Sequence, residues 1–163
     1  MQILDQPQIK RKIKRLALQV AENNLDAGTL YIGGINNNGK RFAAMLSEQI
    51  NDLTSLQVIH FDIKLNPANP VDQAVQFSIE PHVLNDKNIL IVDDVANTGR
   101  TLFYAFKPLM HIVPNQIEAA VLVDRKHKSF PVKVDYVGLS LSTTLHEVID
   151  VRLHEEKLSA HLN

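Results

Sequence analysis

The sequence predicts an α/β fold in which a central, mostly parallel sheet is flanked by helices. Apolar runs of strand length at 29–35, 56–61, 89–92 and 117–123 predict strands. The segments that follow the first and third of these runs repeat their apolar residues at helical spacing. The run at 89–92 is apolar without interruption, which is typical of a central parallel strand covered on both faces.

The length and composition fit one ordinary globular domain spanning residues 1–163. A chain of 163 residues is long enough to bury a substantial core. Its net charge of −1 gives no global bias toward nucleic acid. Without cysteine, disulfides and thiol chemistry are excluded. Neither a signal peptide nor an apolar run of membrane-spanning length is present, so we expect a cytoplasmic protein without membrane contact.

The first helix is expected to begin at Asp5 or Gln6, because Pro7 is welcome in a first turn. Its apolar stripe consists of Ile9, Ile13, Leu16, Ala17 and Val20, and its other side carries Lys10, Arg11, Lys12, Lys14 and Arg15. That basic side is either a solvated face or a surface for RNA phosphates or an acidic partner.

A glycine-containing loop is expected over residues 33–39, between the strand at 29–35 and the next helix. Gly34, Gly39 and Lys40 fit the spacing of a Walker A phosphate loop. Arg41 follows, however, and cannot replace the hydroxyl that holds magnesium in that motif. A nucleotide triphosphatase is therefore disfavoured.

The segment from Ile63 to Phe77 interrupts the regular pattern with two prolines and several turn-forming residues. A loop of this length in a compact domain is usually functional or mobile. The alternative is a β-hairpin extension without a role in catalysis.

The stretch from Asn88 to Leu102 holds the strongest chemical signal. Asp93 and Asp94 end a buried strand, where carboxylates are expensive to desolvate, so we expect them to face a cleft and bind hydroxyls or a hydrated cation. The small, hydroxyl-rich turn at 96–101 leads into a helix expected to run through Met110, and such a turn presents backbone N–H groups to an anion. Together they describe a site for a ribose 5-phosphate.

The order Ile-Val-Asp-Asp-Val-Ala-Asn-Thr-Gly-Arg-Thr resembles the phosphoribosyl-diphosphate (PRPP) signature of the type I phosphoribosyltransferases. Ala120–Arg125 and Asp135–Gly138 are similar to the bifunctional pyrimidine-operon attenuator and uracil phosphoribosyltransferase family. The resemblance implies that fold, with a small hood formed by the N-terminal segment and about 124–163. It also implies transfer of ribose 5-phosphate from PRPP to a nucleobase, with uracil favoured, release of diphosphate and a need for Mg²⁺.

The resemblance also assigns roles to residues. Asp93 and Asp94 are the catalytic pair and hold the ribose hydroxyls, directly or through water on Mg²⁺. The 5-phosphate is expected to be bound by Ala96, Asn97, Thr98, Gly99, Arg100 and Thr101, and the diphosphate by Asn36, Asn37, Asn38, Gly39 and Lys40. The base is expected to be bound by the hood residues Asp124, Arg125, Tyr136 and Val137. For Tyr136 the alternative, filling the core, stays open.

Departures from the family pattern leave other functions open. The family has Thr-Arg-Gly where this chain has Asn37-Asn38-Gly39, and Tyr-Arg-Asp where it has Phe61-Asp62-Ile63, so two cations near the leaving diphosphate are missing. One alternative is a nucleotide-sensing, RNA-binding regulator of pyrimidine genes with weak or no catalysis, as a homodimer or higher homo-oligomer. Its phosphate contacts would come from Lys10, Arg11, Lys14, Arg15, Lys126 and Lys128. The other is a purine phosphoribosyltransferase, which would differ only at the hood.

Overall fold

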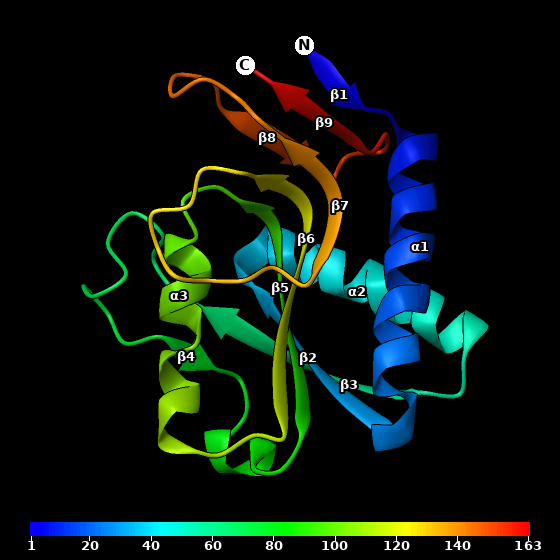
Figure 1. The fold of residues 1–163 in the computed structure, drawn as a ribbon, viewed down its shortest axis with the longest axis vertical. Coiled ribbons are helices and arrows are strands. Elements are labelled where there is room, and N and C mark those ends of the chain that lie inside the picture. The colour runs from blue at the N-terminus through cyan, green and yellow to red at the C-terminus, as the bar shows by residue number, and fades with distance from the viewer.

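The computed structural model describes residues 1–163 and contains two sheets (Figure 1). The main sheet has six strands in the order β4-β3-β2-β5-β6-β7, all parallel except β4. They are β2 (Thr29–Ile35), β3 (Gln57–Lys64), β4 (Gln76–Phe77), β5 (Asn88–Ala96), β6 (Gln116–Arg125) and β7 (Tyr136–Leu141). The smaller sheet, here called the hood sheet, is antiparallel and consists of β1 (Gln2–Leu4), β9 (Ser159–Leu162) and β8 (Ile149–Arg152). The expected mostly parallel α/β fold is confirmed.

Helices cover both faces of the main sheet. Helices α1 (Gln6–Asn24) and α2 (Asn36–Leu53) lie on one face, and the short α3 (Arg100–Ala105) lies on the other (Figure 1). The larger apolar core lies between the main sheet, α1, α2 and the hood sheet, and a second core lies under α3. The central strand β5 contributes to both cores, because alternate residues of a strand face opposite sides. None of the helices has the length and hydropathy that crossing a membrane would require.

Helix α1 begins where the sequence predicts. Asp5 accepts a hydrogen bond from the Gln8 N–H, and the Gln8 side chain accepts one from the Asp5 N–H, both at 2.8 Å. This reciprocal capping satisfies N–H groups that the helix itself leaves without partners. The predicted apolar stripe is buried against the core.

The prediction of a loop over residues 33–39 is wrong, because α2 begins directly after β2. Gly33 and Gly34 lie inside β2, and Asn36 is already the first residue of the helix. A Cβ at Gly33 would lie 2.5 Å from the Phe61 ring of β3. This glycine is needed for close packing inside the sheet, so its small size does not signal a loop.

Helix α3 is shorter than expected. It ends at Ala105, and a 3₁₀ turn continues from Lys107 to His111. Pro108 has no N–H to donate and disfavours helical geometry at the preceding residue. The apolar spacing that predicted a longer helix therefore persists beyond the end of the α-helix.

The segment between β3 and β4 is a hairpin with a long connection, and its expected role in function stays a prediction. Strand β3 extends to Lys64 and pairs antiparallel with β4, so the segment forms a hairpin. Residues 65–75 connect the two strands without regular structure. The connection is here called the 65–75 loop.

The structure corrects the expected extent of the hood. Strand β7, within 124–163, belongs to the main sheet, where it pairs with β6. The hood sheet instead joins the two ends of the chain, β1 and β9, with β8. Strands this short carry too few residues to show an alternating pattern, so β1 and β9 were not predicted.

A buried polar network lies at the end of the main sheet where β5 and β6 begin. Asn24 donates to Glu118 at 3.2 Å, Asn88 donates to Asn24 at 2.9 Å, and the Tyr136 hydroxyl donates to Glu118 at 2.8 Å. No buried side-chain nitrogen or oxygen in the chain lacks a hydrogen-bond partner. The network therefore avoids the cost of burying unsatisfied polar groups.

Candidate functional site

The acidic pair lies at the carboxyl end of β5, as predicted. Asp93 is only 8% exposed, and its Oδ1 accepts a hydrogen bond from the Asp94 N–H at 2.9 Å. Burial, and then the negative charge of Asp94, raises the pKa of Asp93 well above its usual range. Ionising both carboxyls is therefore unfavourable at this site, and a bound cation would offset that cost.

The first turn of α2 lies directly against this pair. The Asn38 amide donates from Nδ2 to Asp94 Oδ2 at 2.8 Å. A Cβ at Gly39 would lie 2.7 Å from the Val92 carbonyl oxygen and 3.4 Å from Asp93 Oδ1. A glycine at 39 is therefore what allows the helix to reach the end of β5. The expected diphosphate residues and the expected ribose residues are adjacent.

Asn36 ties the 65–75 loop to the same turn. It adopts a φ of 52°, which is uncommon for a residue other than glycine. Its amide accepts from the Leu65 N–H at 3.1 Å and donates to the Leu65 carbonyl at 3.0 Å. The side chain thus pairs with the backbone of Leu65 and fixes the start of the loop.

The two cations beside this turn already have partners. Lys40 forms an ion pair with Asp62 at 3.1 Å, and Arg41 donates to the Leu153 carbonyl at 3.2 Å. The Lys40 side chain is 62% exposed, so its pair is worth little and can open. Lys40 therefore remains available to an anion at small cost. The remaining residue of the turn, Asn37, is exposed, and its carbonyl lies 3.3 Å from His154 Nε2.

The predicted phosphate turn surrounds a cavity of about 490 Å³. Gly99 has a φ of 86°, and a Cβ there would lie 2.5 Å from Val132, so the turn requires glycine. The cavity begins at Val95, immediately after the acidic pair, although neither aspartate lines it. Its walls are Pro67, Val95, Ala96, Asn97, Thr98, Gly99, Arg100, Thr101, Leu102, Ser129 and Phe130.

Contacts from distant segments hold this turn in place. The Thr98 carbonyl accepts from the N–H groups of Ser129 at 2.9 Å and Phe130 at 3.1 Å. Arg100 donates to the Pro67 carbonyl at 2.6 Å and so connects the turn to the 65–75 loop. The sequence offered no signal for Pro67, Ser129 or Phe130, because their role follows from contacts across the fold.

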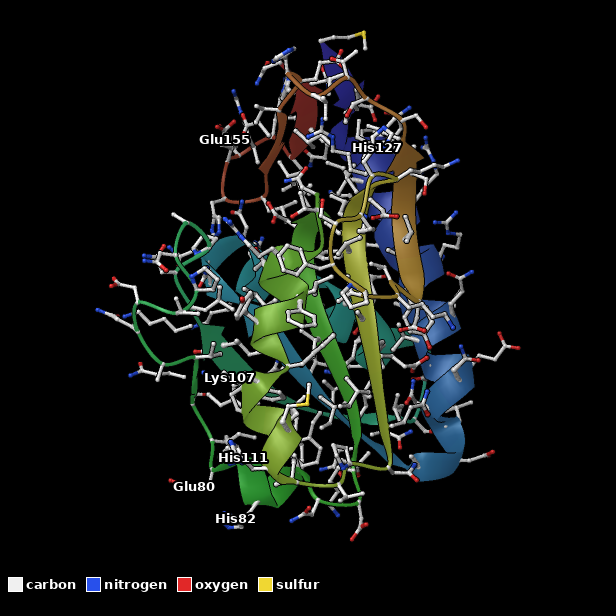
Figure 2. All side chains as sticks on the ribbon, turned by 60° about the vertical axis from the view of Figure 1, so that its left-hand side comes forward. Glu80, His82, Lys107, His111, His127 and Glu155 are labelled. Atoms are coloured by element: carbon white, nitrogen blue, oxygen red, sulfur yellow. The ribbon has the colours of Figure 1, made fainter.

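Asp124 and Arg125, expected at the base, form contacts within the protein. The Lys128 ammonium pairs with Asp124 and also donates to the Arg125 carbonyl. Arg125 donates to Thr143 Oγ1 and to the Thr144 carbonyl, which anchors the connection between β7 and β8. Figure 2 shows the neighbouring His127 at the hood end of the molecule, with Glu80, His82 and His111 at the opposite end.

The structure corrects the expectation for Tyr136 and Val137. Tyr136 is only 3% exposed and belongs to the core and the polar network, so it fills the core and offers no face to a base. Burial is the main cause that raises the pKa of its hydroxyl. The Val137 carbonyl accepts from Arg15 at 2.8 Å, so the expected base contact already has a partner within the protein.

The basic side of α1 divides into two groups. Lys12 donates to the Gly138 carbonyl at 2.9 Å, and Arg15 donates to the Val137 carbonyl, so both cover the free edge of β7. Burial, and then the charges of Arg15 and Arg11, lowers the pKa of Lys12. Lys10, Arg11 and Lys14 form no hydrogen bond or ion pair; they line a groove of about 600 Å³ that also contains Glu48, Glu155 and Glu156. Of the six expected RNA contacts, Arg15 and Lys128 are thus already bound within the protein.

The sequence and the fold are similar to those of known proteins. The phosphoribosyl transferase domain family matches residues 1–156. The chain is 36% identical over 160 residues to "Bifunctional protein PyrR" of Deinococcus radiodurans, covering 94% of this chain and 87% of the relative. It is 31% identical over 156 residues to the "Pyrimidine operon regulatory protein" of Lactococcus lactis, covering 94% and 90%.

Solved structures agree on the fold. The hypoxanthine phosphoribosyltransferase of Trypanosoma cruzi superposes with a TM-score of 0.75 at 20% identity, covering 91% of this chain and 84% of that chain. A hypoxanthine-guanine phosphoribosyltransferase of Bacillus anthracis gives 0.72 at 18% identity, covering 86% and 82%. At such low identity these likenesses show the fold alone. Together with the sequence relatives, they establish that this chain belongs to the phosphoribosyl transferase domain family and is similar to the bifunctional PyrR proteins within it.

Proposed function

We propose that this protein transfers ribose 5-phosphate from PRPP to a nucleobase, with uracil favoured, and releases diphosphate. The observation that carries the proposal is the placement of the acidic pair. Asp94 contacts the first turn of α2 through Asn38, and the phosphate cavity begins one residue after it, at Val95. One phosphorylated sugar can thus reach both anion-binding turns while its ribose lies at the carboxylates.

The acidic pair fits a bound Mg²⁺. Mg²⁺ is usually held by one or two carboxylates together with substrate oxygens and water. Asp93 and Asp94 supply two carboxylates, the first of them buried, and a cation would offset the cost of ionising both. When bound, Mg²⁺ would neutralise the leaving diphosphate. The carboxylates hold the ribose hydroxyls, directly or through the water on that ion.

The reaction exchanges one bond at the ribose for another. The bond from C1 of ribose to the diphosphate oxygen breaks, the bond from C1 to a base nitrogen forms, and the base loses the proton on that nitrogen. Positive charge develops on the ribose ring, and the Asp94 carboxylate would stabilise that charge. The N–H groups at 96–101 hold the 5-phosphate, so the ribose stays fixed while C1 moves.

The direct test offers the protein PRPP and Mg²⁺ with uracil, hypoxanthine, guanine, adenine or xanthine, one base at a time. We expect the nucleoside monophosphate of uracil, and we expect Asp94→Asn to reduce kcat by about 10²-fold or more. A product from a purine alone would identify the protein as a purine phosphoribosyltransferase instead. No product from any base, combined with no calorimetric binding of PRPP, would refute the proposal.

A second function, RNA binding by a pyrimidine-gene regulator, is favoured by Lys10, Arg11 and Lys14. These cations have no partner in the chain and share one face of α1. Each phosphate contact adds to the salt dependence of affinity. We expect the double variant K10A/K14A to weaken RNA binding about tenfold and to reduce the salt slope by about 2.

The matched control for that experiment is K87A/K107A, which removes the same charge from exposed lysines away from α1. Figure 2 shows Lys107 beside His111, at the end opposite the hood. Equal losses in both double variants would mean that the α1 face is not the RNA surface. The proposal also includes a cytoplasmic location and a homo-oligomeric state, and light scattering of the purified protein checks the latter.

A further inference from the structure

Asn38 occupies a position between the acidic pair and the hood sheet. Its Nδ2 donates to Asp94 Oδ2 on β5 at 2.8 Å and to the Val151 carbonyl on β8 at 3.3 Å. An amide nitrogen carries two hydrogens, so one group can serve both acceptors. A single side chain therefore connects the main sheet, the hood sheet and the first turn of α2.

The Asp94 carboxylate is oriented from both sides. Its Oδ1 accepts from the Val95 N–H at 2.9 Å, and its Oδ2 accepts from Asn38. The first contact is local to β5, whereas the second comes from another element and fixes the rotation of the carboxyl plane. The terminal torsion of an aspartate is otherwise broad, so this plane would turn freely without the second contact.

Asn38 is the side chain of this turn that contacts Asp94, and the other polar side chains have different partners. Asn36 binds the backbone of Leu65, Lys40 pairs with Asp62, and Arg41 donates to Leu153. Asn38 stands where the resembling family has an arginine, so orientation by a neutral donor replaces a charge at this position.

We propose that Asn38 is the positioning residue of the acidic pair and sets how tightly the site grips a ribose. This inference rests on the proposed function, because it assumes that Asp94 binds the ribose hydroxyls. Asn38 acts through Asp94 and through the hood strand and needs no contact with the ribose. It should therefore affect ligands that contain a ribose more than a bare phosphate.

The test compares two ligands by calorimetry in Mg²⁺: inorganic phosphate, which has no ribose, and ribose 5-phosphate, which adds the ribose that the carboxylates would hold. The ratio of their affinities measures the contribution of the ribose. In Asn38→Leu, which removes both donors at similar size, we expect this ratio to fall about tenfold, which corresponds to about 1.4 kcal/mol. Phosphate affinity should fall less than ribose 5-phosphate affinity, because phosphate makes no use of the carboxylates.

Asn38→Asp sharpens the test, because it keeps the shape of the side chain and replaces a donor by a like charge beside Asp94. It should also lower the ratio. Asn51→Leu and Asn51→Asp are the matched controls, since Asn51 is an exposed residue of the same helix that makes no side-chain hydrogen bond. Both controls should retain the wild-type ratio.

The outcomes separate this inference from the proposed function. If wild type binds ribose 5-phosphate no more tightly than phosphate, the proposed role of the acidic pair is wrong, and so is this inference. If wild type prefers ribose 5-phosphate and Asn38→Leu keeps the same preference, only the role of Asn38 is overturned. Equal losses for phosphate and ribose 5-phosphate would show a merely structural contact, and would also overturn it.

Discussion

Asp93 is a carboxylate whose burial opposes its own ionisation. Its side chain is 8% exposed and lies beside Asp94, and burial is the main cause that raises its pKa. A carboxyl whose pKa is raised on folding lowers the stability of the folded state as pH rises above its unfolded pKa of about 3.9, and the loss grows until pH reaches the folded pKa. At neutral pH, Asp93 is therefore a cost to stability that the site retains for its chemistry.

We therefore expect Asp93→Asn to unfold at a higher temperature than wild type at pH 7. A gain of 1 kcal/mol would raise Tm by about 2–4 °C in a chain of this length. The gain should shrink as pH falls and vanish below about pH 4, where the carboxyl is protonated in both folded and unfolded wild type. Thermal melts of both proteins between pH 3 and 8 measure it, and a difference that does not change with pH would contradict the assignment.

The residues that follow a local motif could be predicted from sequence, whereas their partners could not. One short motif contains Asp93, Asp94 and Gly99, so the sequence identifies them directly. The bond from Asn38 to Asp94 joins positions far apart in the chain, and three consecutive asparagines gave no reason to single out the third. Tyr136 was left open because an aromatic residue fits a core and a base site equally well from sequence.

Among the elements, the start of α2 depends on the close approach of Gly39 to β5. A methyl group at 39 would lie 2.7 Å from the Val92 carbonyl oxygen, so backbone would have to move. Helix propensity alone favours alanine over glycine by about 1 kcal/mol. The two effects have opposite signs, which makes the substitution informative.

We expect Gly39→Ala to destabilise the protein by about 1–3 kcal/mol, because overpacking against backbone outweighs propensity. It should also weaken phosphoribosyl ligands, since the first turn of α2 would shift away from the acidic pair. Urea unfolding measures the stability. A variant more stable than wild type would show that the contact relaxes without strain.

The free edge of β7 is protected by α1. Arg15 donates to the Val137 carbonyl, and Lys12 donates to the Gly138 carbonyl. Edge strands with open carbonyls invite pairing with other chains. Two long cationic side chains therefore cover the outer edge of the main sheet.

We expect Arg15→Ala to lose about 1 kcal/mol of stability, the usual worth of such a hydrogen bond, and to self-associate more at high concentration. Lys14→Ala is the control, because Lys14 is exposed and has no partner. Urea titration and analytical ultracentrifugation are the measurements. If Lys14→Ala behaves in the same way, the effect belongs to net charge and not to the strand edge.

Element types could be read from sequence, but some boundaries could not. The capping residue Asp5 and the strand at 29–35 were placed by local chemistry. The start of α2 and the end of α3 were missed, because glycines in β2 imitate a loop and Pro108 interrupts a pattern that is otherwise helical. In both cases the residue pattern occurs in two kinds of structure, and the prediction followed the commoner kind.

At the scale of the whole molecule, the hood sheet depends on its middle strand. Strand β9 pairs with β1 on one side and β8 on the other. Leu4, Val151 and Ala160 are buried where this sheet meets the main core. The main sheet has its own pairing and does not need β9 for any backbone hydrogen bond.

We expect a chain that ends at Leu158 to lose amide protection in β1 and β8 and to keep it in β5 and β6. Local unfolding of this kind follows from the uneven distribution of stability within a structure. Hydrogen exchange read by mass spectrometry would show it. Uniform loss of protection would mean that the two sheets unfold as one unit.

The overall architecture was predictable because strong motifs and long apolar runs lie in the main sheet. A hood from the N-terminal segment and about 124–163 was expected, but its strands β1 and β9 could not be read from sequence, because they pair across nearly the whole length of the chain. Three-residue and four-residue strands leave too little pattern for sequence to distinguish from a loop.

The pairing of β1 with β9 brings the chain ends together, with the Met1 amine 2.6 Å from the Leu162 carbonyl (Figure 1). A short glycine-rich bridge could therefore close the polypeptide into a ring, and the ring could be cut at an exposed position such as 68–69. Such a rewired molecule would keep every strand neighbour it has now. It would also carry its new ends beside the ligand cavity, where a fluorescent label could report binding.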